Sequence, residues 1–320
     1  MKIVKIIGLI VILILGLALL ILGASTLYHR RQLQKEAKAY LPSASMVALN
    51  GKRIHVHTAG EGDSTLVFLS GHGTSSPALD FKPLWMRMKD DYRIAVVEKS
   101  GYGWSEPSNT PRDIDTILEE TRTALNLSGE QGPYVLLPHS MSGLEAIYWA
   151  QKYPDEVKAI IGLDPLTPEA ADILPAPDQS QLNAMYLVSR VGLSRFMPEA
   201  DLELNFPLLN SEVLTADEKQ RYLAAFYRSA FTRDMLREVR YLEGNFAAVA
   251  ERAVPVDTPM LFFISEGQEA QVKGWEASLL EYLSNIAWGE YRVLAGGHYL
   301  HYENSELIAE ELSAFLEEVQ

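Results

Sequence analysis

The chain contains no cysteine among its 320 residues. Disulfide bonds, thiol nucleophiles and metal sites with Cys ligands are therefore excluded, although the absence of cysteine does not decide the compartment. The sequence also lacks internal repeats and low-complexity tracts. With 48% hydrophobic and 22% charged residues, its composition is that of one large globular domain, or of one domain with an insertion.

Net positive charge is confined to the N-terminal segment. Residues 1–40 carry six Lys or Arg and one Glu, a net charge of +5, whereas the whole chain carries −14. Residues 41–320 therefore carry a net charge of −19. A body this acidic argues against a nucleic-acid partner, because phosphate binding requires clustered Lys and Arg side chains.

The N-terminal segment lacks charge over the 23 residues from Ile6 to Tyr28. A helix of about 20 apolar residues can cross a bilayer. A cleaved signal peptide would have a shorter apolar core and a clear small-residue cleavage site, of which Leu22-Gly23-Ala24 is a poor example. We therefore expect an uncleaved transmembrane anchor over residues 1–28 and a basic juxtamembrane spacer over residues 29–45.

Basic residues flank the apolar segment on both sides, so the positive-inside rule does not orient it. An N-terminal anchor followed by an acidic domain most often places that domain outside the cytoplasm. The sequence thus favours a single-pass protein of the cell membrane with an extracytoplasmic domain.

Apolar runs typical of buried strands alternate with helical patterns over residues 46–165 and 253–320. This alternation predicts an α/β core with a mostly parallel sheet flanked by helices. Residues 166–252 interrupt it with a helical stretch that contains several prolines. We expect a helical cap inserted after the strand that ends at Asp164, and long insertions at that edge commonly shape substrate pockets. A helical subdomain with no role in binding is the alternative.

A hairpin is predicted near the start of the core, where Asn50-Gly51 separates two short apolar strands. His55 and His57 alternate along its second strand, which raises the possibility of a metal pair. No third ligand stands nearby, so we expect two solvent-facing histidines on an edge hairpin and no metal site.

A candidate nucleophile follows the strand-like run that begins at Tyr134. Ser140 is flanked by small residues and is followed directly by a helical pattern. A tight turn between strand and helix exposes a hydroxyl and places helix N–H groups behind it. If Ser142 were the nucleophile, Leu144 would occupy a crowded position, so Ser140 is the better candidate. A Ser that merely caps the helix of an ordinary βα unit is the alternative.

Ser140, Asp164 and His298 each follow the C-terminal end of a different predicted strand. Open α/β sheets build their sites at that edge. A Ser hydroxyl needs a His to remove its proton, and the His needs a carboxylate to hold its tautomer. The chain order Ser, acid, His is specific to one fold. His301 is a near rival of His298, but it lies closer to the last predicted helix.

Four segments carry a family resemblance from about Met46 to the C-terminus. They are Leu69-Ser70-Gly71-His72-Gly73, Gly101-Tyr102-Gly103-Trp104-Ser105, Pro138-His139-Ser140-Met141-Ser142-Gly143 and Gly296-Gly297-His298. In this order and spacing they resemble the α/β-hydrolases with a Ser nucleophile, namely esterases, lipases and aminopeptidases. The resemblance implies that the backbone N–H groups of His72 and Met141 form the oxyanion hole. The chain departs from the family where Ser70-Gly71 replaces His-Gly, and where Pro138 and Ser142 replace Gly.

The acid of the triad departs further from the family pattern. Most relatives place it after the strand at 259–264, where Gln268 stands here, and Gln carries no negative charge. Pancreatic-type lipases take it instead from a Gly-Leu-Asp-Pro context, which Gly162-Leu163-Asp164-Pro165 matches. We therefore select Asp164, with Glu269 and then Glu266 as alternative acids. An Asp that only initiates a turn before Pro is the competing interpretation.

The resemblance implies a serine hydrolase that cleaves an ester or amide bond of a small-molecule, apolar substrate through an acyl-enzyme. An esterase or lipase is favoured over a peptidase, and no metal or organic cofactor is implied. Dehalogenases and epoxide hydrolases of this fold use an Asp nucleophile, so Ser140 argues against both. The alternative is a non-catalytic, membrane-anchored binding protein on the same fold. A carboxylate within hydrogen-bond reach of His298 would discriminate between them.

Overall fold

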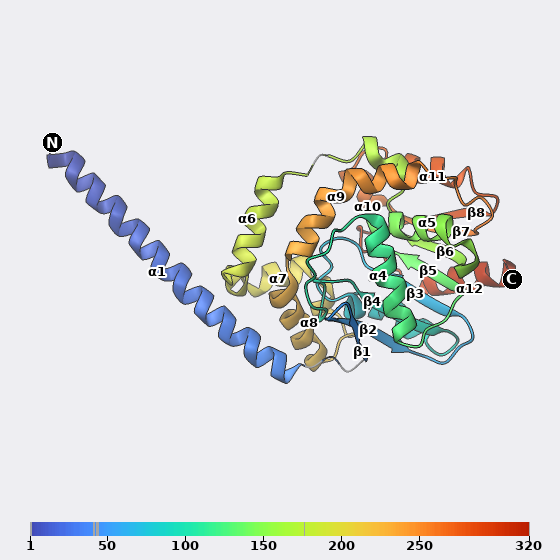
Figure 1. Ribbon diagram of the computed structural model, residues 1–320, viewed down its shortest axis with the longest axis horizontal. Helices are drawn as coiled ribbons and strands as arrows, with labels where there is room; N and C mark the ends of the chain where they lie inside the picture. The colour runs from blue at the N-terminus through green and yellow to red at the C-terminus, as the bar shows by residue number, and fades with distance from the viewer. Residues whose placement is uncertain (1, 41, 43–44, 176, 320) are drawn as a thin grey trace.

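The computed structural model describes residues 2–40, 42, 45–175 and 177–319. Within these residues, one sheet of eight strands forms the centre of the molecule, in the order β1-β2-β4-β3-β5-β6-β7-β8 (Figure 1). The strands are β1 Ser45–Leu49, β2 Lys52–Ala59, β3 Thr65–Leu69, β4 Arg93–Glu98, β5 Tyr134–Pro138, β6 Val157–Leu163, β7 Met260–Ser265 and β8 Gly289–Leu294. The pairs β1–β2 and β2–β4 are antiparallel and the remaining pairs are parallel, so the predicted mostly parallel α/β sheet is confirmed.

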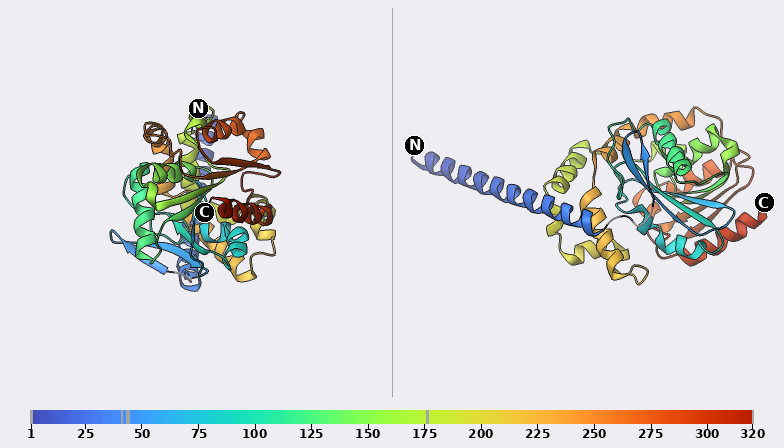
Figure 2. Two further views of the ribbon diagram at one scale, coloured as in Figure 1. Left: turned by 90° about the vertical axis from the view of Figure 1, so that its right-hand side faces the viewer. Right: turned by 60° about the horizontal axis from the view of Figure 1, so that its bottom comes forward.

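Helices cover both faces of the sheet, which explains why β3, β5 and β7 are buried along their whole length (Figures 1 and 2). One face packs against α4 Ile114–Leu127, α5 Ser142–Lys152 and α11 Trp275–Leu283. The other packs against α2 Pro77–Asp80, α3 Lys82–Met88 and α12 Ser305–Glu318. The short helix α10 Glu266–Gln271 directly follows β7.

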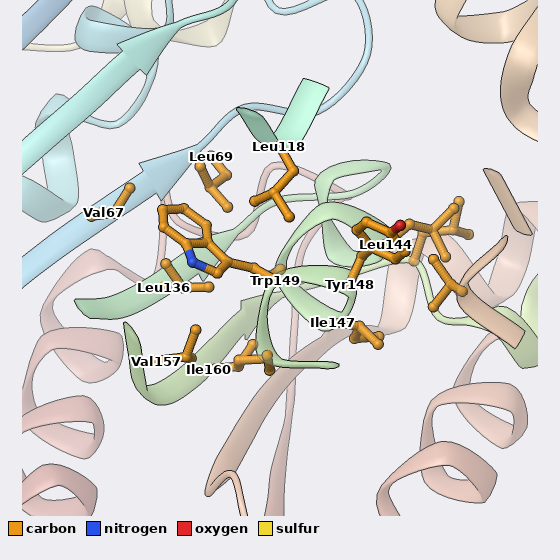
Figure 3. Close-up of a cluster of buried hydrophobic side chains, with 14 of the residues drawn as sticks. Val67, Leu69, Leu118, Leu136, Leu144, Ile147, Tyr148, Trp149, Val157 and Ile160 are labelled. Carbon is orange, nitrogen blue, oxygen red and sulfur yellow. The ribbon is translucent and has the colours of Figure 1, made fainter. Parts of the chain in front are cut away.

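The helix α5 is fixed on the sheet by Trp149. Its indole is fully buried and lies beside Leu69 and Leu136, which come from β3 and β5 (Figure 3). The indole N–H donates a hydrogen bond to Glu156 Oε2 at 2.8 Å. Because α5 begins two residues after Ser140, this packing also sets where the turn at Ser140 stands.

The predicted helical insertion is present between β6 and β7. Its elements are η2 Pro168–Asp172, α6 Gln179–Arg190, η3 Leu193–Phe196, α7 Glu199–Asn205, η4 Pro207–Asn210, α8 Ala216–Ser229 and α9 Arg233–Ala250. The longer helices carry N-caps that fix their starts: Asp178 on α6, Thr215 on α8 and Thr232 on α9 accept from backbone N–H groups of the first turn. We call residues 166–252 the cap.

The N-terminal helix α1 is continuous from Lys2 to Ala39 and projects from the cap end of the molecule (Figures 1 and 2). It is long and apolar enough to span a membrane, and its most apolar part is fully exposed. The sequence predicts a separate spacer over residues 29–45, whereas residues 29–39 continue the helix. No Gly or Pro interrupts the stretch from Tyr28 to Ala39, so nothing in it ends the helix.

The hairpin of β1 and β2 lies at the edge of the sheet as predicted, but its histidines do not face solvent, and that part of the prediction is wrong. The strand β2 pairs with β1 on one side and with β4 on the other. His55 is buried, with Nδ1 2.9 Å from Glu98 Oε2, and the ring of His57 packs on Trp85 at 4.8 Å between centroids. Within the described residues, no group of three or more His, Asp or Glu is arranged to hold a metal ion.

Candidate active site

Ser140 stands in a strained turn between β5 and α5. Its φ of 54° lies in the left-handed region that non-glycine residues rarely adopt. The turn is held at both ends, because Leu166 N donates to Ser140 O at 2.8 Å and Ser140 N donates to Leu163 O at 3.4 Å. A strained Ser between a strand and a helix is the geometry that presents a nucleophilic hydroxyl at the sheet edge.

Ser142 has a structural role in the same turn. Its hydroxyl is buried, donates to Leu69 O at 2.6 Å and accepts from His139 N at 3.0 Å. Ser142 is therefore unsuited to act as the nucleophile. The residue after Ser142 in this turn, Gly143, has no room for a side chain, because an added Cβ would lie 2.2 Å from Leu166 O.

The loop after β3 passes directly over Ser140. A Cβ on Gly71 would lie 2.8 Å from the Cβ of Ser140, so this backbone approach requires glycine. The predicted oxyanion residues, His72 in this loop and Met141 at the start of α5, thus lie on the two segments that adjoin Ser140. The His72 ring faces Glu238 of the cap, with Nδ1 3.9 Å from Glu238 Oε2.

His298 follows β8 and contacts Asp164. The distance between His298 Nδ1 and Asp164 Oδ2 is 2.6 Å, while the His298 side chain keeps 22% of its surface exposed. The loop is also held by His139, whose Nε2 donates to the backbone O of His298 at 3.0 Å. Burial lowers the pKa of His139 well below its usual value, so this ring is neutral.

Asp164 is completely buried and all its contacts are hydrogen-bond donors. Oδ1 accepts from Ser265 N at 3.0 Å and from Trp275 Nε1 at 2.8 Å. Oδ2 accepts from Ser265 Oγ at 2.7 Å, in addition to its contact with His298. The carboxylate is therefore oriented by β7 and α11. Ser265 and Trp275 were missed from the sequence, although Ser265 ends the strand after which the acid is usually found.

The alternative acids lie elsewhere. Glu269 accepts the backbone N–H groups of Gly274 and Glu276, each at 3.0 Å. These bonds, that from Gly274 first, lower the pKa of the Glu269 carboxyl. Glu266 is exposed on the first turn of α10, and no hydrogen bond joins either glutamate to His298 in the described part of the chain.

His301, the rival of His298, is a packed core residue. It is fully buried, and its ring lies 5.0 Å from that of Phe81 and 5.1 Å from that of His139 between centroids. Burial lowers its pKa to about 3, so it is neutral near pH 7. The His301 ring thus packs on His139, which in turn holds the backbone of His298.

A cavity of about 260 Å³ lies between the core and the cap beside His298. Its lining is mostly aromatic and polar, and is formed by Gly73, Thr74, Ser75, Asp80, Leu204, Asn205, Phe206, Pro207, Tyr222, Gly297, His298, Tyr299, Tyr302 and Glu303. The cap therefore contributes one wall of a space that reaches His298.

Asp80 is a buried acid in the wall of this cavity. Its Oδ1 accepts from Tyr222 Oη at 2.7 Å and from Tyr302 Oη at 2.5 Å, and Ser76 N lies 3.3 Å from Oδ2. Burial raises the pKa of Asp80 from 3.8 to about 6, although these hydrogen bonds oppose the shift. Between about pH 4 and pH 6 the folded protein therefore keeps a proton on Asp80 that the unfolded chain has already released.

We expect Asp80→Asn to stabilise the protein at neutral pH. The raised pKa means that stability falls as the pH rises from about 4 to about 6, by roughly 3 kcal/mol for a shift of about two units. Asn cannot ionise and keeps Oδ1 as the acceptor for both tyrosines, although its NH₂ group then faces the N–H of Ser76 and offsets part of the gain. Thermal unfolding in detergent should show a higher midpoint for Asp80→Asn than for the parent at pH 7.5 and no such gain at pH 4, while the exposed Asp90→Asn changes neither. A lower midpoint at pH 7.5 would contradict this.

Comparison with known proteins assigns the family. The α/β-hydrolase fold profile matches residues 65–238. The uncharacterised protein YbdG of Bacillus subtilis is 38% identical over 259 residues, which cover 80% of this chain and 79% of YbdG. Serine hydrolase BPHL of Mus musculus is 28% identical over 122 residues, 37% of this chain and 42% of that protein.

Among solved structures, the epoxide hydrolase of Bacillus megaterium in complex with an inhibitor is similar in fold. The TM-score is 0.62 at 18% sequence identity, and the match covers 85% of this chain and 100% of that one. The profile match spans more than half of the chain and agrees with the eight-stranded sheet and its helical insertion. The chain therefore belongs to the α/β-hydrolase fold family.

Proposed function

We propose that the protein is a serine hydrolase in which Ser140 is the nucleophile, His298 the general base and Asp164 the carboxylate that orients His298. The observation that carries this proposal is the distance of 2.6 Å between His298 Nδ1 and the buried Asp164 Oδ2. A non-catalytic binding fold has no need of a fully buried carboxylate aimed at a partly exposed imidazole. At the coarser level of a hydrolase, the family match and the named relatives support the same conclusion.

In the proposed mechanism, Ser140 Oγ attacks the carbonyl carbon of an ester or amide while His298 Nε2 takes its proton. Asp164 accepts from Nδ1–H of His298 and stabilises the imidazolium that forms. The leaving group then departs with the proton from His298, and a covalent acyl-enzyme remains. Water, activated by the same His298, attacks this ester and releases the acid and free Ser140.

The negative charge on the substrate oxygen needs donors that are in place before the reaction. We assign this role to the backbone N–H groups of His72 and Met141, whose segments adjoin Ser140 on two sides. Both residues act through the main chain, so their side chains are free to vary. The chain itself supplies every group that this mechanism uses, and the proposal includes no metal or organic cofactor.

The proposed substrate is a small ester with an apolar acyl or alcohol part. The wall of the cavity beside His298 contains Phe206 and three tyrosine rings, which suit an apolar group, together with polar and acidic side chains such as Asp80 and Glu303. Epoxide hydrolases and dehalogenases of this fold differ at the nucleophile, where this chain has Ser140. An esterase-like or lipase-like activity therefore fits better than either, and a peptidase fits less well.

We further propose that α1 is a single-pass membrane anchor and that the rest of the chain lies outside the cytoplasm. The support is the length and exposure of the apolar helix, together with the acidic body that follows it. This proposal concerns location alone and is independent of the chemistry at Ser140.

Labelling with a fluorophosphonate probe tests the enzyme proposal without knowledge of the substrate, because the probe reacts with an activated Ser in place of an ester. The full-length protein in detergent should be labelled, Ser140→Ala should not, and the exposed Ser284→Ala should react like the parent. Labelling that persists in Ser140→Ala would refute the assignment of the nucleophile. A folded protein that is not labelled at all would favour the non-catalytic binding protein.

A further inference from the structure

The end of α1 is docked firmly on the cap. Arg195 of η3 donates from its two terminal nitrogens to Glu36 Oε1 and Oε2, both at 2.7 Å, and from Nε to His29 Nδ1 at 2.8 Å. The pair is largely buried, and the guanidinium also stacks over the ring of Tyr227 at 4.3 Å. A buried, bidentate ion pair of this kind fixes the direction of the contact as well as its distance. The orientation of α1 relative to the cap is therefore fixed.

The docking extends toward the apolar part of α1. Ser25 Oγ donates to Val191 O at 2.7 Å, and the ring of Tyr28 lies 6.1 Å from that of Phe196 between centroids. Both contacts join the last turns of the apolar segment to the cap between α6 and α7. The cap thus begins where the proposed membrane-spanning segment ends.

Large apolar side chains are exposed around this junction. We call Met185, Leu187 and Val188 of α6, with Phe196 at the end of η3, the cap patch; their exposed fractions run from 37% to 63%. Figures 1 and 2 show that α6 lies beside the place where α1 leaves the cap. The surfaces of soluble proteins seldom have several large apolar side chains exposed close together, and such patches mark contact with a partner or a membrane.

The surroundings of the cap patch favour a lipid bilayer as the occupant. Phe196 of the cap patch contacts Tyr28 of α1, and the apolar part of α1 is itself unburied. Exposed basic side chains stand at the same level, at Arg30 and Arg31 of α1 and at Arg190 of α6. Basic side chains at this depth pair with anionic headgroups while their stems lie along apolar surface. The rest of the body is acidic and is repelled by such a surface.

We propose that the cap patch inserts into the boundary between headgroups and acyl chains of the bilayer that α1 crosses. The cap then contacts the bilayer directly through one face, instead of being connected to it by α1 alone. This inference rests on the anchor proposed above. It also deepens the proposed substrate class, because the cap that forms one wall of the cavity beside His298 then lies at the membrane surface, where apolar esters concentrate.

The absence of cysteine allows a direct test in the full-length chain. Leu187→Cys, labelled with a nitrobenzoxadiazole dye, is placed in vesicles of phosphatidylcholine and phosphatidylglycerol that contain a lipid with a nitroxide near the top of its acyl chain. Leu127→Cys at the end of α4 is the matched control, since it is an exposed Leu on the core with 53% of its surface free. Leu15→Cys reports on the anchor itself.

Nitroxide quenching at Leu187 that reaches at least half of that at Leu15, with none at Leu127, is the expected result. Quenching at Leu15 alone would contradict insertion of the cap patch and would still agree with the membrane anchor. A Leu187 label that is shielded from aqueous iodide but not quenched by lipid would indicate a protein partner, such as a second copy, and would also refute the proposal. No quenching at Leu15 would remove the anchor as well. None of these readouts depends on activity, so the serine hydrolase proposal stands or falls separately.

Discussion

Replacing Asp164 with Asn is expected to slow acylation of Ser140 by about 10⁴-fold, the size of effect seen when a triad carboxylate is made neutral. Asn carries no charge to stabilise the imidazolium, and its amide can hold the wrong tautomer of His298. The change should be measured as the rate of fluorophosphonate labelling at saturating probe. Most of the loss should fall on this rate constant, because Asp164 is buried and does not line the cavity beside His298.

The contacts of Asp164 explain why Asn cannot adapt. Oδ1 faces the N–H groups of Ser265 and Trp275, and Oδ2 faces the Ser265 hydroxyl and His298. Whichever way the Asn amide turns, its NH₂ group meets at least one N–H donor on β7 and α11, or the imidazole. Burying one unpaired donor costs about 1–3 kcal/mol, so we expect a modest loss of stability beside the loss of rate.

Glu269→Gln is the matched control for this prediction. Glu269 accepts two backbone N–H groups, and a Gln side-chain oxygen can retain part of that role. Labelling should therefore proceed at the parent rate in Glu269→Gln. If Asp164→Asn keeps the parent rate while Glu269→Gln loses it, the acid is Glu269 and the assignment made here is wrong.

The sequence was sufficient for the fold because its signals are local. Runs such as Thr65–Leu69 and Met260–Ser265 are apolar throughout, which indicates strands covered on both faces. The candidate site residues could be found for the same reason, since Ser140, Asp164 and His298 each follow the end of such a strand. The parallel order of β5, β6, β7 and β8 brings these three residues to one edge of the sheet, where His298 is hydrogen-bonded to Asp164.

What the sequence could not supply depends on contacts between distant segments. The histidines of the edge hairpin were expected to face solvent, but His55 is buried beside Glu98 of β4, a contact that no local pattern encodes. Trp275 reaches Asp164 across 111 positions, and Arg195 reaches Glu36 across 159. Side chains that orient a catalytic group are chosen by packing, so their residue types alone do not reveal them.

A second large effect is expected beneath the loop that carries His72, where Arg112 is completely buried between two carboxylates. Its Nη1 donates to Glu120 Oε2 at 3.0 Å and its Nη2 to Glu238 Oε1 at 3.1 Å. Burial alone would raise the pKa of Glu238, but Lys99, His72 and Arg112 together hold it well below its usual value. The Glu238 carboxyl is thus charged because of the donors and positive charges around it. Glu238 also accepts from the buried Tyr102 hydroxyl, so this cluster joins the cap helix α9 to the core.

Arg112→Met is therefore expected to destabilise the protein by about 3–5 kcal/mol, because it leaves two buried carboxylates without their main partner. The control is the exposed ion pair of Arg53 and Glu106. Arg53 donates to Glu106 Oε1 from Nε at 3.0 Å and from Nη2 at 2.9 Å. Arg53→Met should cost about 1 kcal/mol or less, since water screens an exposed pair. Chemical unfolding of the full-length chain in detergent measures both.

A second substitution can show whether Arg112→Met destabilises the protein through lost charge pairing or through lost packing. Glu238→Gln in the Arg112→Met background removes one of the unpaired charges and keeps an acceptor for the Tyr102 hydroxyl. We expect this double variant to be more stable than Arg112→Met alone, whereas Glu238→Gln in the parent should be destabilising because it weakens a paired cluster. If the two substitutions simply add, Arg112 acts by filling space, and the electrostatic account of the junction between cap and core is wrong. Coupling of the expected sign would instead show that the cap is held to the core, next to the loop over Ser140, by charge.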